Sequence, residues 1–169
     1  MIILGIDPGT ANTGFGVVSN IKSKNQNRLR CLDYGCIKTS PKLTDGARLE
    51  KINTELKKII KKYQPKVMAV ENVYFFKNLK TAFPVSQAKG VILFTAAKKK
   101  IPVYEFTPLQ VKMAITGYGK ADKKQIQKMI KVILNLKEPP RPDDAADALA
   151  IAVCSINFIK TLKGVDKLA

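Results

Sequence analysis

Two kinds of hydrophobic pattern alternate along this chain, and the first is a set of short runs rich in Val, Ile, Leu and Phe. Such runs are typical of strands when Gly, Pro or acidic residues bound them, and nearly continuous runs are typical of strands covered on both faces. A turn is expected over residues 9–14 and a hairpin tip near residues 25–27. The predicted strands cover residues 1–7, 15–18, about 29–39, 67–71 and 103–106.

The second pattern is helical, with apolar residues recurring every three or four positions. It is clearest after Thr44–Asp45, where Leu49, Ile52 and Leu56 follow at this spacing before Pro65 ends the helix. Pro84 lies within a second predicted helix over residues 79–99 and is expected to shift its start or to kink it. Further helices are predicted over residues 108–115 after a Thr107 cap, beyond an Asp122 cap to about 134, and over 143–162.

Three strands in succession, followed by alternating helices and strands, predict the α/β class with a mixed sheet flanked by helices. A chain of 169 residues is long enough to bury one full hydrophobic core but not two. We therefore expect a single domain over residues 1–169, in which only about the last seven residues are frayed.

Charge is the unusual property of the composition, because 30 Lys and Arg residues stand against 13 Asp and Glu and give a formal net charge of +17. Such an excess is typical of proteins that bind polyanions, since neutralising phosphates releases counterions. A solvated lysine-rich surface without a partner is the alternative. A membrane surface is disfavoured, because no segment joins a basic face to a large aromatic apolar face.

We expect neither a signal peptide nor a membrane anchor, and therefore a cytoplasmic location. The first apolar run stops at Asp7 without a basic region before it, and no run reaches the 18 or so residues that cross a bilayer. The three cysteines form no CxxC pattern, which argues against disulfides and zinc. The absence of histidine excludes His general bases and His-ligated metals.

Four carboxylates stand where apolar elements begin or end. Asp7 and Glu71 end predicted strands, and active groups gather at the carboxyl ends of strands in open α/β sheets. Asp144 and Asp147 lie three residues apart at a predicted helix start, so they share a face. If the two strands are neighbours, the four acids converge, and bound cations would offset their repulsion. Oxygen ligands alone favour Mg²⁺ or Mn²⁺.

Each acid taken alone has a simpler structural explanation. Asp143, Asp144 or Asp147 could satisfy free N–H groups and the dipole at a helix start. Asp7 could merely open a turn, and Glu71 could pair with a lysine. These explanations are independent of one another, whereas a single metal site accounts for all of the positions together.

Five segments carry further information about the chain's relationships. They are Ile3-Leu-Gly-Ile-Asp-Pro-Gly-Thr10 with Gly14, Val70-Glu-Asn-Val-Tyr-Phe-Phe-Lys-Asn78, Gln87-Ala-Lys-Gly90, Gln110-Val-Lys112 and Asp144-Ala-Ala-Asp-Ala-Leu-Ala150. Over residues 1 to about 155, these segments resemble the RuvC family of Holliday junction resolvases in their order and spacing. The first segment alone is weak, because sugar kinases, actin and Hsp70 chaperones share its Asp-x-Gly-Thr, but the combination is specific.

The resemblance implies an RNase H-like fold with a mixed five-stranded sheet flanked by helices. It also implies a homodimer that cuts two symmetry-related strands of a four-way DNA junction, with metal, in recombination and repair. Whether branch-migration proteins of the RuvA and RuvB type are partners stays open.

By position, the family's metal ligands fall on Asp7, Glu71, Asp144 and Asp147, and Asp143 is interpreted as a helix cap. Lys112 and Lys123 match basic positions that are implicated in DNA binding or cleavage. Tyr74 matches an aromatic residue that enters the junction, where the family often has Phe. The predicted DNA contacts are Tyr74, Phe75, Lys77, Lys112, Lys120 and Lys123.

Two cations about 4 Å apart could activate a water, stabilise the charged transition state and support the departing 3′-oxygen. The products would be a 5′-phosphate and a 3′-hydroxyl. Two alternatives remain. A non-catalytic junction- or DNA-binding protein explains the charge but not the four acids. An actin-like phosphotransferase built on residues 7–10 needs a second glycine-rich phosphate loop and a much longer chain.

Overall fold

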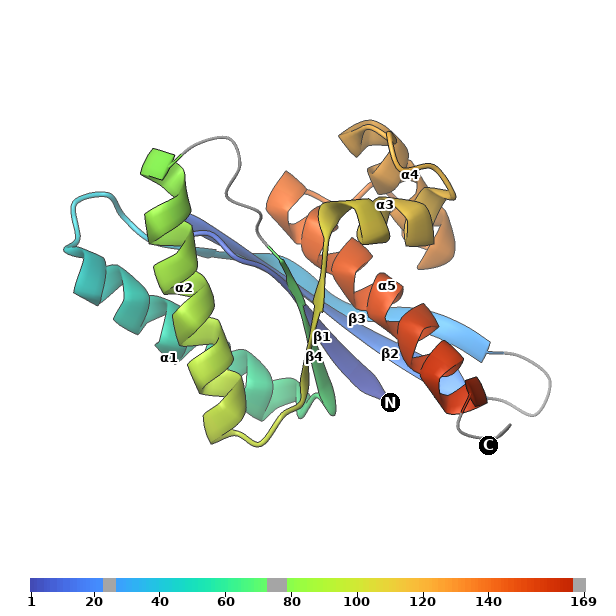
Figure 1. Ribbon diagram of the computed structural model, residues 1–169, viewed down its shortest axis with the longest axis horizontal. Coiled ribbons are helices and arrows are strands. Elements are labelled where there is room, and N and C mark those ends of the chain that lie inside the picture. The colour runs from blue at the N-terminus through green and yellow to red at the C-terminus, as the bar shows by residue number, and fades with distance from the viewer. Residues whose placement is uncertain (23–26, 73–78, 166–169) are drawn as a thin grey trace.

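The structure is a computed structural model that describes residues 1–22, 27–72 and 79–165 (Figure 1). Residues 25 and 26 of the expected hairpin tip and the last of the residues expected to fray lie outside this description, whereas Asn27 already begins a strand. The strands are β1 (Ile2–Asp7), β2 (Asn12–Lys22), β3 (Asn27–Lys38), β4 (Val67–Glu71) and β5 (Val103–Phe106). The helices are α1 (Asp45–Tyr63), α2 (Leu79–Lys98), α3 (Pro108–Thr116), α4 (Lys123–Ile133) and α5 (Asp143–Val165).

The strands form one five-stranded sheet in the order β3-β2-β1-β4-β5. Neighbours are antiparallel from β3 to β1 and parallel from β1 to β5, so the predicted mixed sheet is confirmed. Helices α1 and α2 cover one face, and α3, α4 and α5 cover the other (Figure 1). No helix among the described residues is long and apolar enough to cross a membrane.

The alternation of side chains along β1 divides the interior into two cores. Leu4 and Ile6 belong to the core beneath α1 and α2, whereas Ile3 belongs to the core beneath α5. Because successive side chains point to opposite faces of a strand, Gly5 and Asp7 share the α5 face with Ile3. The first strand therefore directs its final carboxylate toward α5.

Glycines on the sheet let α5 lie directly against the strands. A Cβ atom on Gly5 would lie 2.1 Å from the carbonyl oxygen of Ala148, and one on Gly14 would lie 2.0 Å from that of Asp144. Gly16 approaches the backbone of Leu149 in the same way. On the helix side this seam consists largely of fully buried alanines. The backbone of α5 therefore packs directly on the backbones of β1 and β2, and this contact determines the position of the first turn of α5.

Most element boundaries agree with the sequence prediction, but β2 (Asn12–Lys22) extends beyond the predicted residues 15–18 at both ends, and Pro84 does not shift the start of α2. Strand β2 starts at Asn12 rather than at Phe15, because Gly14 pairs with Asp7 and extends the ladder through the predicted turn. Helix α2 begins at Leu79 and continues through Pro84, so the proline does not delay its start.

The helix caps predicted at Thr107 and Asp122 are present, and Thr44 forms a further cap. Thr44, Thr107 and Asp122 each accept a hydrogen bond from a backbone N–H group in the first turn of the following helix. In α3 and α4 the bond is reciprocated by a Gln side chain, which completes a capping box. Helix α1 ends at Gln64 in the left-handed conformation, one residue before the predicted stop at Pro65.

Candidate active site

The ends of β1 and β4 bring two of the predicted acids together. The strands are parallel neighbours with Ile6 in register with Val70, so Asp7 and Glu71 follow side by side at the same edge of the sheet. Both face α5, and their side chains are hydrogen-bonded to each other. The condition for the acids to converge, that these two strands be neighbours, is therefore met.

Helix α5 brings the other two acids to the same place. Asp144 lies in its first turn, directly over Gly14, and Asp147 follows one turn later. Burial raises the pKa of Asp7 to about 8, and the negative charges of neighbouring carboxylates add to that rise. The contributing carboxylates are those of Glu71, Asp147 and Asp144. All four predicted acids therefore form one electrostatically connected group, which we call the tetrad.

Lys123, the first residue of α4, lies beside the tetrad. Its Nζ donates to Oδ2 of Asp147 over 3.3 Å, and this carboxylate raises the pKa of the lysine. The pKa of Asp147 is nevertheless raised, because burial outweighs the nearby ammonium. Burial, followed by the charge of Asp147, also raises the pKa of Glu71. The site thus holds more negative charge than one lysine neutralises.

The donor chemistry of the tetrad suits a hard divalent cation. Its carboxylate oxygens are the ligands that Mg²⁺ and Mn²⁺ prefer, and the chain contains no histidine. Within the described residues, no three His, Cys, Asp or Glu side chains form a ready metal-binding group. Asp7 instead bonds to Glu71, and Asp147 bonds to Lys123. The tetrad is therefore a cluster of suitable donors rather than a preformed coordination shell.

The other predicted site residues are distributed less tightly. Lys112 lies half-buried on α3, and in the described part of the chain it forms no ion pair with the tetrad. Lys120 is exposed in the loop between α3 and α4. Tyr74, Phe75 and Lys77 fall outside the described residues. The structure thus brings Lys123, but not Lys112, into contact with the acids.

Asp143 is the first residue of α5 and contacts α4. It is exposed, and its Oδ1 accepts a hydrogen bond of 2.8 Å from Nε2 of Gln127 on α4. A helix cap would accept hydrogen bonds from N–H groups in the first turn of its own helix. The side-chain bond of Asp143 instead joins it to the neighbouring helix α4. Its charge still helps to raise the pKa of Asp147.

Cys36 is a site neighbour that the sequence analysis did not identify. It lies on β3 opposite Gly14 of β2, and its Sγ is 3.9 Å from Oδ2 of Asp144. Burial, together with this carboxylate, raises the pKa of the thiol to about 11. The β2–β3 register determines this contact, and the local sequence around Cys36 carries no sign of it.

Lys89 on α2 braces the residue that follows Glu71. Its Nζ donates to Oδ1 of Asn72 over 3.1 Å and to Oε2 of Glu105 over 2.5 Å. The backbone N–H of Asn72 also donates to the carbonyl oxygen of Phe106 over 2.7 Å. These bonds tie α2 to the ends of β4 and β5. In the sequence, Lys89 lies within the Gln87–Gly90 segment, which resembles the family but carries no sign of these bonds.

The raised pKa of Asp7 predicts a pH-dependent stability of the metal-free protein. Native Asp7 keeps its proton up to about pH 8, whereas the unfolded chain loses it near the ordinary value of about 3.9. The native state therefore binds more protons between these values, and the free energy of unfolding should fall as pH rises from about 4 to 8. Each such proton contributes at most about 1.4 kcal/mol per pH unit.

Urea unfolding in EDTA at several pH values would measure this decline. The Asp7→Asn variant should show a much shallower one, because its amide does not titrate. An equal slope in both proteins would show that Asp7 does not hold a proton in the native state.

Comparisons with known proteins agree with this geometry. The family model for "Crossover junction endodeoxyribonuclease RuvC" matches residues 3–155. The chain is 52% identical to RuvC of Desulforamulus reducens over 97% of this chain and 98% of that one. It is 53% identical to RuvC of Caldicellulosiruptor saccharolyticus over 92% of both chains.

Solved structures show the same relationship. Thermus thermophilus RuvC superposes with a TM-score of 0.87 at 36% identity, covering 95% of this chain and 96% of that one. The yeast mitochondrial resolvase Ydc2 has a TM-score of 0.69 at 13% identity, with 98% and 83% covered, and supports the fold alone. The predicted RNase H-like fold is thus confirmed. The family match over residues 3–155 and the 52% identity to a RuvC nuclease over nearly the full length show that the chain, with its carboxylate tetrad, belongs to the RuvC family of crossover junction endodeoxyribonucleases.

Proposed function

We propose that this chain resolves four-way DNA junctions by two symmetric metal-dependent nicks. The observation that carries the proposal is the tetrad at the ends of β1 and β4, beside Lys123, in a member of this nuclease family. A T. thermophilus RuvC solved in complex with a Holliday junction substrate supports the choice of DNA. It has a TM-score of 0.85 at 33% identity and covers 95% of this chain and 96% of that one.

In this proposal the tetrad holds Mg²⁺ or Mn²⁺, with two ions per site. When bound, such ions supply an activated water and stabilise charge on the scissile phosphate and the departing 3′-oxygen, which leaves a 5′-phosphate. The protein's own contribution is to hold Asp7 and Glu71 on rigid strands and to align Asp144 and Asp147 through the glycine seam. Release of the proton held by Asp7 would make its carboxylate available as a ligand.

Basic residues beside the tetrad suit a DNA backbone. A hollow of about 720 Å³ at the start of α5 is lined by Lys123, Lys124 and Arg141, among others, and extends to Asp144. Lys and Arg side chains of this kind contact phosphates without reading sequence. We also propose that Lys112, Lys120 and Lys77 contact DNA, and that Tyr74 and Phe75 do so as well. An aromatic side chain stacked on an unpaired base contributes about 1 to 3 kcal/mol.

A homodimer follows from the need for two cuts, since each chain supplies one tetrad. Helix α2 offers a surface for a second copy, because Phe83 is 69% exposed and Phe94 is 58% exposed. The two residues are about three helical turns apart and so lie on the same face. Whether proteins of the RuvA and RuvB type act with this chain stays open.

The decisive experiment uses a synthetic four-way junction labelled on two opposing strands. With Mg²⁺ or Mn²⁺ the chain should nick both labelled strands at symmetric positions and leave a linear duplex of the same sequence uncut, because only the junction presents two symmetry-related strands at a branch point to the two active sites of the dimer. Denaturing gels resolve the products. Absence of cutting with either metal would reject the proposal.

The alternatives predict different results. If the chain were a non-catalytic DNA-binding protein, Glu71→Gln would leave every measured activity unchanged. An actin-like phosphotransferase would release phosphate from nucleotides, but family membership over residues 3–155 argues against this class.

A further inference from the structure

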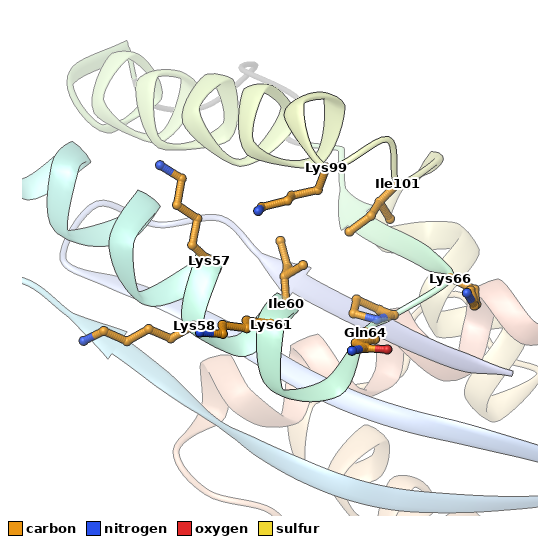
Figure 2. A pocket seen from close by; sticks show the side chains of 9 residues that line it. Lys57, Lys58, Ile60, Lys61, Gln64, Lys66, Lys99 and Ile101 are labelled. Atoms are coloured by element: carbon orange, nitrogen blue, oxygen red, sulfur yellow. The ribbon is translucent and has the colours of Figure 1, made fainter.

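A basic hollow lies at the opposite edge of the sheet from the tetrad, between the C-terminal ends of α1 and α2 (Figure 2). Its volume is about 460 Å³, and five of its nine lining residues are lysines, while none is acidic. Lys66 directly precedes β4, whose other end carries Glu71. Four steps of about 3.3 Å separate the two ends of this strand, so a phosphate bound here is more than about 13 Å from the tetrad. The lining residues are Lys57, Lys58, Ile60, Lys61, Gln64, Pro65, Lys66, Lys99 and Ile101.

The positive charge of this hollow is poorly compensated by the protein. Nζ of Lys58 pairs with Oε1 of Glu55 over 2.7 Å. The other four lining lysines form no ion pair within the described residues. Lys57, on α1, and Lys99, which directly follows α2, extend into the gap between these two helices (Figure 2). Like charges that converge without partners repel one another, and a bound anion would remove this repulsion.

Helix dipoles account for only part of the cluster. A lysine in the last turn of a helix offsets the partial negative charge of its carbonyl groups, which explains Lys61 at the end of α1. Lys57 lies one turn earlier, and Lys66 lies beyond the helix. The hollow therefore gathers cations that the helix ends do not require.

We propose that this hollow binds the phosphodiester backbone of a second DNA duplex while the catalytic edge holds the junction. The lining lysines are flexible point charges, which suit successive phosphates regardless of sequence. The lining contains neither an aromatic residue for stacking a free base nor an Arg fork for a carboxylate. This composition favours a DNA backbone over an acidic protein. Because the hollow cannot reach the scissile phosphate, the inference goes beyond the proposed cleavage reaction.

The test measures binding of a fluorescent linear duplex to full-length protein already saturated with unlabelled junction, in EDTA. The wild type should bind the duplex. Lys57→Gln combined with Lys99→Gln should weaken this binding at least about fivefold. Two lost phosphate contacts should also reduce the slope of log affinity against log salt by about 1.8, since each contact contributes about 0.9. Junction cleavage in Mg²⁺ should stay within about twofold of wild type.

The matched control is Lys51→Gln combined with Lys137→Gln. Both lysines are exposed and lie outside the hollow, and the control removes the same two charges. Its duplex affinity should stay within about twofold of wild type. Equal weakening by the two double variants would attribute the effect to net charge and overturn the inference.

Other outcomes would also overturn the inference. Failure of the saturated wild type to bind the linear duplex, or binding of poly-glutamate in its place, would exclude DNA as the ligand. Loss of junction cleavage in the Lys57 and Lys99 variant would assign the hollow to the junction's own path. Wild-type cleavage that fails altogether would instead count against the proposed function.

Discussion

The Asp7→Asn variant is expected to lose junction cleavage by more than about a hundredfold while it still binds the junction. The carboxylate of Asp7 lies at the centre of the tetrad, where it bonds to Glu71 and senses both acids of α5. Even residues that only support metal ligands cost about 10- to 100-fold when they are replaced, so loss of a ligand should cost more. Initial cleavage rates in Mg²⁺ and gel-shift affinities in EDTA measure the two quantities.

Two further measurements test whether the loss of cleavage is specific to Asp7: the stability of this variant and the activity of a variant at a neighbouring acid. Asn keeps the shape of the side chain and removes charge from a crowded group, so at pH 8 the variant should be at least as stable as wild type. Asp143→Asn is the control, because Asp143 precedes the tetrad on α5 and bonds to Gln127 instead. It should retain cleavage within about tenfold. Equal losses in the two variants would show that general charge near α5, rather than the tetrad, governs cleavage.

The Gly14→Ala variant is expected to lose both stability and cleavage, although no catalytic group is changed. The new Cβ would lie 2.0 Å from the carbonyl oxygen of Asp144 and 2.5 Å from its carbonyl carbon. Both are backbone atoms, so the first turn of α5 must move away from β2 and carry Asp144 with it. Overpacking of this kind typically costs about 1 to 3 kcal/mol. Urea unfolding and cleavage rates below the unfolding transition would separate the two effects.

Gly46→Ala is the matched control for this substitution. Gly46 lies in the first turn of α1, and no heavy atom lies within 4 Å of its added Cβ. Alanine in a helix is favoured over glycine by about 0.5 to 1 kcal/mol, so this variant should be neutral or slightly stabilised and fully active. A Gly14→Ala variant with wild-type stability and cleavage would show that the seam can separate without cost.

Local sequence was enough to predict what strand and helix ends contribute to the site. Asp7 and Glu71 each close an apolar run, and the structure places both at one edge of the sheet. The acids at the start of α5 follow on one helix, as their spacing of three residues predicted. The caps at Thr107 and Asp122 were equally local features.

Features that depend on register or on distant contacts were not predictable in this way. The contact of Cys36 with Asp144 requires the pairing of β3 with β2. The brace from Lys89 joins residues that are 16 and 17 positions apart in the sequence. The early start of β2 reflects a glycine whose role is to admit α5, whereas glycine between polar residues is ordinarily a turn signal.

The seam between α5 and the sheet also has a thermal consequence. Glycine and alanine have no side-chain rotamers to lose on burial, so this contact forms without the side-chain conformational entropy that larger residues forfeit. Heating therefore gains no side-chain conformational entropy from the glycines and alanines that hold Asp7 close to Asp144 and Asp147. The alignment of the acids should persist until the domain as a whole unfolds, and cleavage should cease in a single step with the loss of structure.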